Sequence, residues 1–348
     1  MAKEIIELNS SIISTASVVG KKEFEGPLGS LFDLHGDDDR FGKETWEMAE
    51  GEMQRLAFNL ALKKADLGFS DIRAIFAGDL LNQCVGSSYG LLGCNIPYFG
   101  IYGACSTSAE GLMLAAIMTS NKVFDRCAAV TSSHNCAAER QFRTPIEYGG
   151  QRTPTSQWTV TGSAAFVVGE GRRGCVRISA ALPGRVVDKG VSDANNMGAA
   201  MAPALCDTLC RFFSESGTRP SDYDLIATGD LGHEGTAILR TLMSVKGYEM
   251  GRQYTDCGIL IFDKETQDTH SGGSGCGCSA TVLSAYILPE ILKGRFKKVL
   301  FIASGAMMSP DSIKQGQSIP AVGHLLLLET HQEANEVAQA ANDVGFAQ

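Results

Sequence analysis

The chain has no hydrophobic run long enough to cross a membrane. Its longest apolar candidates, residues 299–308 and 325–328, fall short of the roughly 18 apolar residues that mark a membrane-spanning helix. The first residues also lack the order of charged, apolar and small residues that defines a signal peptide. We therefore expect a soluble chain that has neither segment.

An excess of positive charge is also absent. Lysine and arginine total 30 against 39 aspartate and glutamate residues, which gives a net charge of -9. Nonspecific binding to nucleic acid or to an anionic membrane needs a basic surface. We predict that nucleic acid is not a partner and that any association with a membrane comes through other proteins.

The eleven cysteines lack the spacing of a metal site. Cys206 and Cys210 are four residues apart, and Cys276 and Cys278 are two apart, but neither pair has a second Cys or His pair at zinc-ligand spacing. Without an export signal, we expect reduced thiols. We predict core packing for both pairs, no metal site and no cofactor.

The most informative feature that is present is the stretch Gly-Ala-Cys-Ser-Thr-Ser at residues 103–108. An apolar run precedes it and a helical pattern follows it, so the Cys105 thiol is expected at a helix N-terminus. Free N–H groups and the helix dipole favour the thiolate there, as in many nucleophiles. The same turn also suits a small core residue, and the stretch alone does not decide between the two.

Two parts of the chain repeat the same order of elements. In the first part the order is helix 44–66, strand 72–77, the Cys105 turn, helix 109–119 and strand 126–131. In the second part it is helix 198–215, strand 223–228, a Gly-rich turn at 271–278, helix 281–292 and strand 298–303. Each early strand is followed by Gly-Asp-Leu, at Asp79 and Asp230. We predict a duplicated α/β chain with halves 1–175 and 176–348.

The predicted halves bring three side chains toward one region. Ligands of open α/β sheets bind beyond the carboxyl ends of the strands. Cys105 lies at such an end in the first half, His233 follows the equivalent strand of the second half, and His270 precedes the Gly-rich turn. We expect a shared pocket that holds all three.

These residues resemble the thiolase superfamily, which includes the β-ketoacyl synthases. The resemblance implies a duplicated fold with five layers, αβαβα. It matches Cys105 with the family's nucleophile, His233 with its first histidine, and His270 with its second histidine or asparagine.

Further motifs are similar to one branch of that superfamily, the stage V sporulation protein AD family of spore-forming Firmicutes. They lie at residues 14–20, 25–29, 131–135, 138–143 and 147–150. The resemblance implies a component of the stage V sporulation protein A system that binds dipicolinic acid, with calcium, for uptake into the developing spore and release in germination. Its implied partners are the membrane subunits of that system, which would place it peripherally at the forespore or spore inner membrane. A homodimer is compatible with the superfamily.

The implied ligand is a planar pyridine with two carboxylates. Arg forks, helix N-terminal N–H groups and His or Ser donors hold such a dicarboxylate best. The candidate ligand-binding residues are Cys105, Ser106, Cys127, His134, Arg140, Arg143, His233 and His270. A subunit interface is the alternative role for the arginines, and core packing is the alternative for Cys127.

The main alternative function is an acyl-thioester condensing enzyme. In that case Cys105 would attack the thioester, while His233 and His270 would shape an oxyanion site and assist proton transfer. The second cysteine that thiolases carry near the C-terminus is missing from residues 318–324. We therefore expect no catalytic residues and favour ligand binding; a structural scaffold for membrane partners is a third hypothesis.

Overall fold

The computed structural model describes residues 3–142 and 152–330. Before residue 175 the strands are β1 (Ile6–Val19), β2 (Leu34–His35), β3 (Ala74–Gly78), β4 (Tyr98–Gly100), β5 (Arg126–Ser133), β6 (Trp158–Thr159) and β7 (Gly162–Glu170). The helices in the same part are α1 (Lys21–Phe24), α2 (Trp46–Lys64), α3 (Val85–Gly90), α4 (Thr107–Ser120) and α5 (Asn135–Phe142).

The later part of the chain repeats the alternation of strands and helices. Its strands are β8 (Val176–Leu182), β9 (Leu225–Thr228), β10 (Tyr254–Asp256), β11 (Gly273–Ser274), β12 (Lys298–Ala306) and β13 (Ala321–Thr330). Its helices are α6 (Met197–Ser216), α7 (Gly232–Val245), α8 (Cys257–Leu260), α9 (Cys276–Val282), α10 (Leu288–Leu292) and α11 (Pro310–Lys314), with a π-helical turn (Leu283–Ile287) between α9 and α10.

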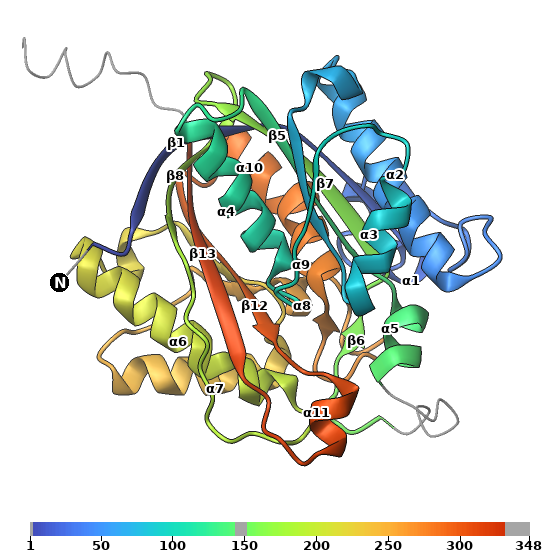
Figure 1. The fold of residues 1–348 in the computed structure, drawn as a ribbon. Coiled ribbons are helices and arrows are strands. Elements are labelled where there is room, and N and C mark those ends of the chain that lie inside the picture. The colour runs from blue at the N-terminus through green and yellow to red at the C-terminus, as the bar shows by residue number, and fades with distance from the viewer. Residues whose placement is uncertain (1–2, 143–151, 331–348) are drawn as a thin grey trace, which may run out of the picture.

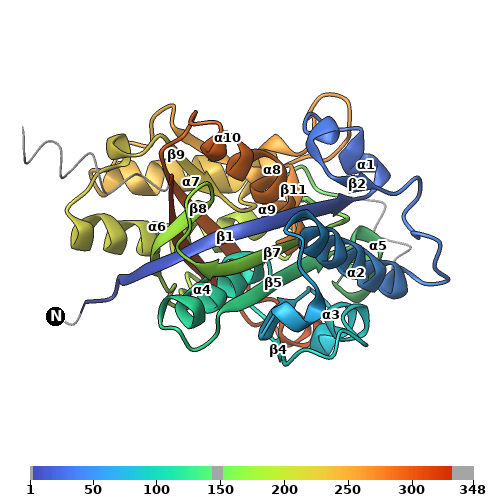
Figure 2. The same ribbon diagram turned by 90° about the horizontal axis from the view of Figure 1, so that it is seen from above.

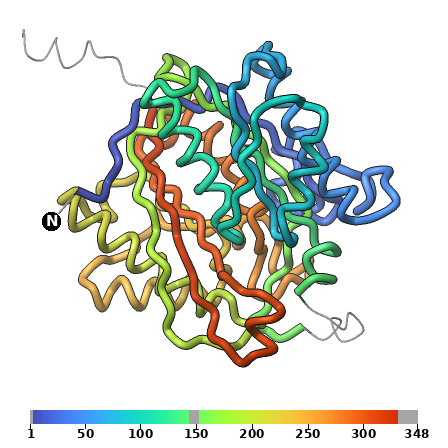
Figure 3. Tube along the Cα trace, viewed as in Figure 1, coloured from blue at the N-terminus to red at the C-terminus, as the bar shows by residue number. Residues whose placement is uncertain are grey.

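The large sheet consists of two sets of strands with the same internal order. One set runs β1-β7-β5-β3-β4 and the other β8-β13-β12-β9-β10. In each set the strand that comes first along the chain pairs antiparallel with the one that comes last, β1 with β7 and β8 with β13. The two pairs farthest from these strands are parallel in both sets. β1 pairs with β7 over residues 10–19 and with β8 over residues 6–12, so it joins the two sets into one continuous sheet. The Cα trace shows β13, in red, alongside β8 (Figure 3). The α/β class is confirmed, while the division at residue 175 stays a prediction.

The helices form three layers around the two sets of strands. α2 and α3 lie at one side of the molecule and α6 and α7 at the other, while α4 and α9 pack in the middle (Figures 1 and 2). α4 contacts strands of both sets, including β5 and β12. A helix that packs on both sides must be apolar nearly all round, and α4 buries Ala109, Leu112, Met113, Ala115 and Ala116. The predicted five-layer arrangement follows from these contacts.

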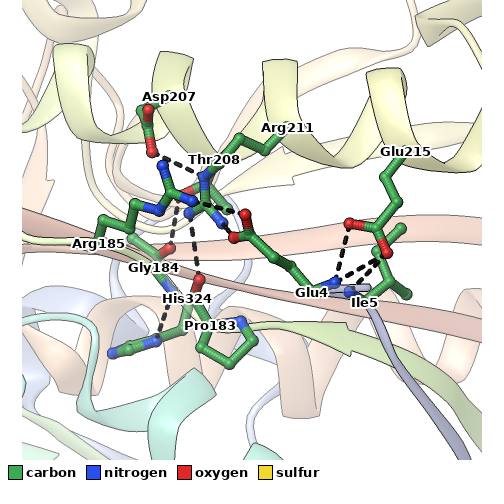
Figure 4. Close-up of polar contacts among 11 residues, drawn as sticks. Glu4, Ile5, Pro183, Gly184, Arg185, Asp207, Thr208, Arg211, Glu215 and His324 are labelled. Carbon is green, nitrogen blue, oxygen red and sulfur yellow. Dashed lines mark hydrogen bonds and ion pairs between the residues drawn. The ribbon is translucent and has the colours of Figure 1, made fainter. Parts of the chain in front are cut away.

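The chain before β1 is fastened to α6 on the outer side of the second strand set. The backbone N–H groups of Glu4 and Ile5 donate to the carboxylate of Glu215, with N···O distances of 2.9 to 3.0 Å (Figure 4). The Glu4 carboxylate in turn accepts from Arg211 at 2.6 Å and from Arg185 at 2.5 Å. These contacts tie the segment that joins the two strand sets to a helix from the later part of the chain.

None of the helices within residues 3–142 and 152–330 is both long and apolar enough to span a bilayer.

Candidate functional site

Cys105 lies in a strained turn that leads directly into α4. Ala104 has a φ of +50°, a left-handed conformation that a residue with a Cβ rarely adopts. The Ser106 hydroxyl donates to the Gly103 carbonyl at 2.6 Å, and the Thr107 hydroxyl donates to the Ala104 carbonyl at 2.7 Å. The Ser106 hydroxyl therefore stabilises the turn, because its proton is donated to the Gly103 carbonyl. The bent backbone places Cys105 directly before Ser106, the N-cap residue of α4, at the helix N-terminus that the sequence predicted.

The end of β12 approaches this turn so closely that only glycine fits there. A Cβ built on Gly305 would lie 2.0 Å from the Gly103 carbonyl oxygen. The second strand set thus packs against the backbone of the Cys105 turn, and it brings side chains from the later part of the chain to the thiol.

Asp230 and Ser274 are the polar side chains that surround the Cys105 thiol. The Cys105 Sγ atom lies 3.9 Å from the Ser274 Oγ atom, and the Ser274 hydroxyl donates to the Asp230 carboxylate at 3.2 Å. Asp230 also accepts from the Gly275 N–H at 2.8 Å and from the Ser304 hydroxyl at 2.8 Å. The parallel pairing of β11 with β6 aligns Ser274 with Thr159 and fixes its position.

This environment keeps the thiol protonated. Burial raises the pKa of Cys105 well above its ordinary value, and the negative charge of Asp230 raises it further. The expectation that the helix N-terminus favours the thiolate is therefore wrong for this site. The dipole of a helix end contributes about 1 kcal/mol, and the burial of the sulfur together with the neighbouring carboxylate outweighs it.

The two histidines expected at the thiol lie elsewhere. His233 is the second residue of α7, where its N–H donates to the Ser271 carbonyl at 2.8 Å. The His270 Nδ1 atom contacts the Thr153 carbonyl at 2.7 Å, and its Nε2 atom lies 3.1 Å from a carboxylate oxygen of Asp268. The structure thus corrects the predicted meeting of both histidines with Cys105.

Two other candidates, Cys127 and His134, also lie away from the thiol. Cys127 is fully buried in the apolar core, at the opposite end of β5 from Ser133. His134 is buried, and its Nε2 atom lies 2.6 Å from the Asp39 carbonyl oxygen. Burial lowers the pKa of His134.

Of the two arginine candidates, Arg140 lies at the surface and Arg143 falls outside the residues that the structure describes. Arg140 is exposed, pairs with Glu47 and lies over the Trp46 ring. Arg143 lies outside the described residues, so its role stays a prediction. Arg152 binds Asp268, with an Nη2–Oδ2 distance of 2.7 Å.

A cavity opens directly beside Cys105. It holds about 70 Å³ of space for the centres of water-sized molecules. Most of its walls are apolar, with a few hydroxyl and amide groups and one carboxylate. The residues that line it are Leu80, Tyr102, Ala104, Cys105, Ala138, Glu139, Phe142, Thr159, Ala194, Asn195, Met197, Ser274, Ala306 and Met308. Among these described lining residues none carries a positive charge, and neither His233 nor His270 is present.

Reasoning from the sequence missed Asp230 and Ser274 as site residues, although it singled out the motifs that contain them. Asp230 is the central residue of the second Gly-Asp-Leu triplet, and Ser274 lies in the Gly-rich turn. The duplication could have identified Asp230, because it predicts that this residue follows the end of a strand next to the pocket. Within the described ranges no three His, Cys, Asp or Glu side chains converge to hold a metal ion.

The site geometry can now be set beside known proteins. In structure the chain resembles a cerulenin-bound OleA from Xanthomonas campestris, with a TM-score of 0.59 and 15% identity over 92% of this chain and 97% of that one. It also resembles 3-oxoacyl-(acyl carrier protein) synthase III from Xanthomonas oryzae pv. oryzae, with a TM-score of 0.59 and 14% identity over 92% and 99% of the two chains. At this identity the likeness shows a shared thiolase-like fold.

The sequence comparisons identify a branch within that fold. Stage V sporulation protein AD of Bacillus subtilis (strain 168) is 42% identical over 316 residues, which are 91% of this chain and 93% of that protein. The model of the stage V sporulation protein AD family matches residues 3–329. The chain belongs to the stage V sporulation protein AD family.

Proposed function

We propose that this protein binds dipicolinic acid in the cavity beside Cys105 and is the dipicolinate-binding component of the stage V sporulation protein A system. Family membership supports a role in sporulation. The observation that carries the binding function is that the cavity ends at a buried, protonated thiol next to a carboxylate. A pocket of the condensing-enzyme fold that lacks an activated nucleophile is suited to hold a ligand without reacting with it.

The walls of the cavity suit a flat aromatic ring with polar substituents. Tyr102 and Phe142 offer ring faces, and Ser274, Thr159 and Asn195 offer hydroxyl and amide groups. None of the described lining residues carries a positive charge that would offset a free dianion. We therefore propose that the ligand enters as its calcium chelate, because the ion offsets the charge of both ligand carboxylates.

The alternative of a condensing enzyme is less well supported. In the condensing hypothesis two histidines shape the oxyanion site and assist proton transfer at the nucleophile, whereas the described polar side chains at the Cys105 thiol are Asp230 and Ser274. The structural likeness to synthases shows a shared fold and does not show a shared reaction.

The proposal extends to partners and location. Peripheral attachment at the forespore or spore inner membrane, through membrane subunits of the same system, would bring the cavity to the transport path. The superfamily resemblance also predicts a homodimer. β4 ends the sheet, and its residues Tyr98 and Phe99 are exposed, so a second copy could add its own β4 at this edge.

The first test is a calorimetric titration of dipicolinate with and without calcium. Ala138 is 3% exposed and lines the cavity, so Ala138→Leu should fill part of the cavity and weaken binding by about tenfold or more. Ala237→Leu, at an exposed position of α7, is the matched control and should bind as the wild type does. Arg143→Gln in the same assay tests that candidate.

Two results would count against the proposal. Absence of saturable binding to the wild type, with and without calcium, would remove the receptor function and make acyl-thioester turnover the next assay. Unchanged affinity in a folded Ala138→Leu variant would place the ligand outside this cavity.

A further inference from the structure

Three sulfur atoms lie close together where α6 packs against α7. Cys206 and Cys210 lie one turn apart on α6, with a distance of 3.9 Å between their Sγ atoms. The Cys210 Sγ atom lies 3.9 Å from the Sδ atom of Met243 on α7. The sequence predicted core packing for the two cysteines, and the structure adds a third sulfur from another helix.

The two thiols are badly placed for a disulfide. Side chains four residues apart on a helix have Cβ atoms about 5–6 Å apart, whereas a disulfide needs a Cβ separation of about 3.5–4.5 Å. Closing the bond between Cys206 and Cys210 would unwind α6. The pair is therefore held as a dithiol, with a gap between its sulfurs that an ion can bridge.

The sulfur spacing matches the coordination geometry of a metal ion. With a metal–sulfur bond of about 2.3 Å, three sulfurs in a plane around one ion lie about 4.0 Å apart. The distances from the Cys210 Sγ atom to the Cys206 Sγ atom and to the Met243 Sδ atom are both 3.9 Å, so two sides of that triangle have the required length. We propose that Cys206, Cys210 and Met243 form a binding site for one soft monovalent metal ion, Cu(I), with two thiolates and one thioether as ligands.

The donor set favours Cu(I) over harder ions. Thiolate and thioether sulfurs select soft ions such as Cu(I), and a site for zinc would normally have a fourth thiolate, imidazole or carboxylate. Within the described residues no third His, Cys, Asp or Glu completes such a set. Binding releases the two thiol protons, so the complex of Cu(I) with two thiolates and a neutral thioether has a net charge of −1. This charge would interact with the nearby side chains of Lys246 and Asp207.

The helices hold the sulfurs in place and leave one way in. α6 and α7 approach very closely, because a Cβ on Gly198 would lie 2.7 Å from the Gly235 backbone nitrogen. Cys206 is 7% exposed and Met243 is fully buried, whereas Cys210 is partly exposed. An ion would reach the site past Cys210 and bind with little rearrangement of the backbone.

The test is an anaerobic titration of the full chain with Cu(I) against a coloured Cu(I) chelator. The wild type should withdraw one equivalent of Cu(I) from the chelator. The double variant Cys206→Ser/Cys210→Ser should lose that equivalent. Met243→Leu, which keeps the side-chain volume and removes the thioether, should keep it with an affinity lower by about tenfold or more.

The matched control is Cys136→Ser/Cys175→Ser, because these are the other partly exposed cysteines in the described chain. It should bind Cu(I) as the wild type does, and X-ray absorption at the copper edge should show three sulfur neighbours. Retention of the equivalent by the Cys206→Ser/Cys210→Ser variant would overturn the site. Unchanged affinity in a folded Met243→Leu variant would overturn the three-sulfur geometry.

Discussion

Replacing Asp230 with asparagine is expected to speed the alkylation of Cys105 by about tenfold at pH 8. Burial and the Asp230 carboxylate raise the pKa of the thiol, and only the thiolate reacts. Burial raises the pKa of Asp230 above its ordinary value, and donation from Gly275 and from the Ser274 and Ser304 hydroxyls offsets part of that rise by favouring the charged form. Removal of that charge should lower the pKa of the thiol and raise the fraction present as thiolate, and we expect this gain to outweigh the lower nucleophilicity of the weaker base.

The measurement is the rate of iodoacetamide modification of each cysteine, followed by mass spectrometry of the peptides. Ser304→Ala is the matched control, because it removes one hydrogen bond to Asp230 and keeps the charge. Cys127 and Cys278 are fully buried, so their rates report any general opening of the fold. An unchanged Cys105 rate in Asp230→Asn, with Cys127 and Cys278 still protected, would mean that Asp230 does not control the thiol.

The same experiment bears on the proposed function. If Asp230 keeps the thiol inert, the cavity can hold a ligand without forming an adduct. The Asp230→Asn variant should then still bind dipicolinate, since Asp230 is not among the lining residues of the cavity. Reactivity and binding would thus be separated by one substitution.

Much of the fold could be predicted from local sequence patterns. The predicted helix at residues 44–66 corresponds to α2, which begins after Thr45, whose hydroxyl caps the helix by accepting from the Met48 N–H at 3.2 Å. The repeated order of elements corresponds to the two equivalent strand sets. These features are readable because helix periodicity, caps and buried strands leave local marks in the sequence.

The site was harder to predict, because it depends on where strands end and which helices meet. β9 ends at Thr228, and Asp230 follows two residues later, whereas His233 is already inside α7. A histidine that matched a family position was therefore expected beside the thiol, where the structure places an aspartate nearer the strand end, Asp230. Met243 was missed for a similar reason, since its contact with Cys210 depends on how α7 packs on α6.

The largest loss of stability is expected from Asp256→Ala, which should lower the free energy of unfolding by about 4 kcal/mol at about pH 4, where the stability contributed by this carboxyl group is full. Asp256 is fully buried and accepts four hydrogen bonds. The donors are the Thr228 hydroxyl at 2.7 Å and the N–H groups of Leu231 at 2.8 Å, Gly232 at 3.0 Å and Ile259 at 3.2 Å. This one carboxylate joins the end of β9 to the starts of α7 and α8, so its removal leaves several buried donors without a partner.

Urea unfolding followed by circular dichroism measures the effect. Asp222→Ala is the matched control, because Asp222 is exposed and accepts from one backbone donor, the Arg219 N–H at 2.8 Å. The control should lose about 1 kcal/mol or less. Equal losses in the two variants would show that the buried network around Asp256 adds nothing beyond an ordinary cap.

The pH dependence of stability gives an independent check on the same residue. Burial, together with the charge of Asp230, raises the pKa of Asp256 from 3.8 to about 7. The folded protein then holds this proton more tightly than the unfolded chain, so the stability that it contributes is full below about pH 4 and is lost as the pH rises through about 7. Asp256→Asn carries no titrating group, so its stability relative to the wild type should increase over that range by about 4 kcal/mol. Parallel stability profiles for the two proteins between about pH 4 and pH 8 would show that Asp256 titrates normally and that the carboxylate is not buried as described.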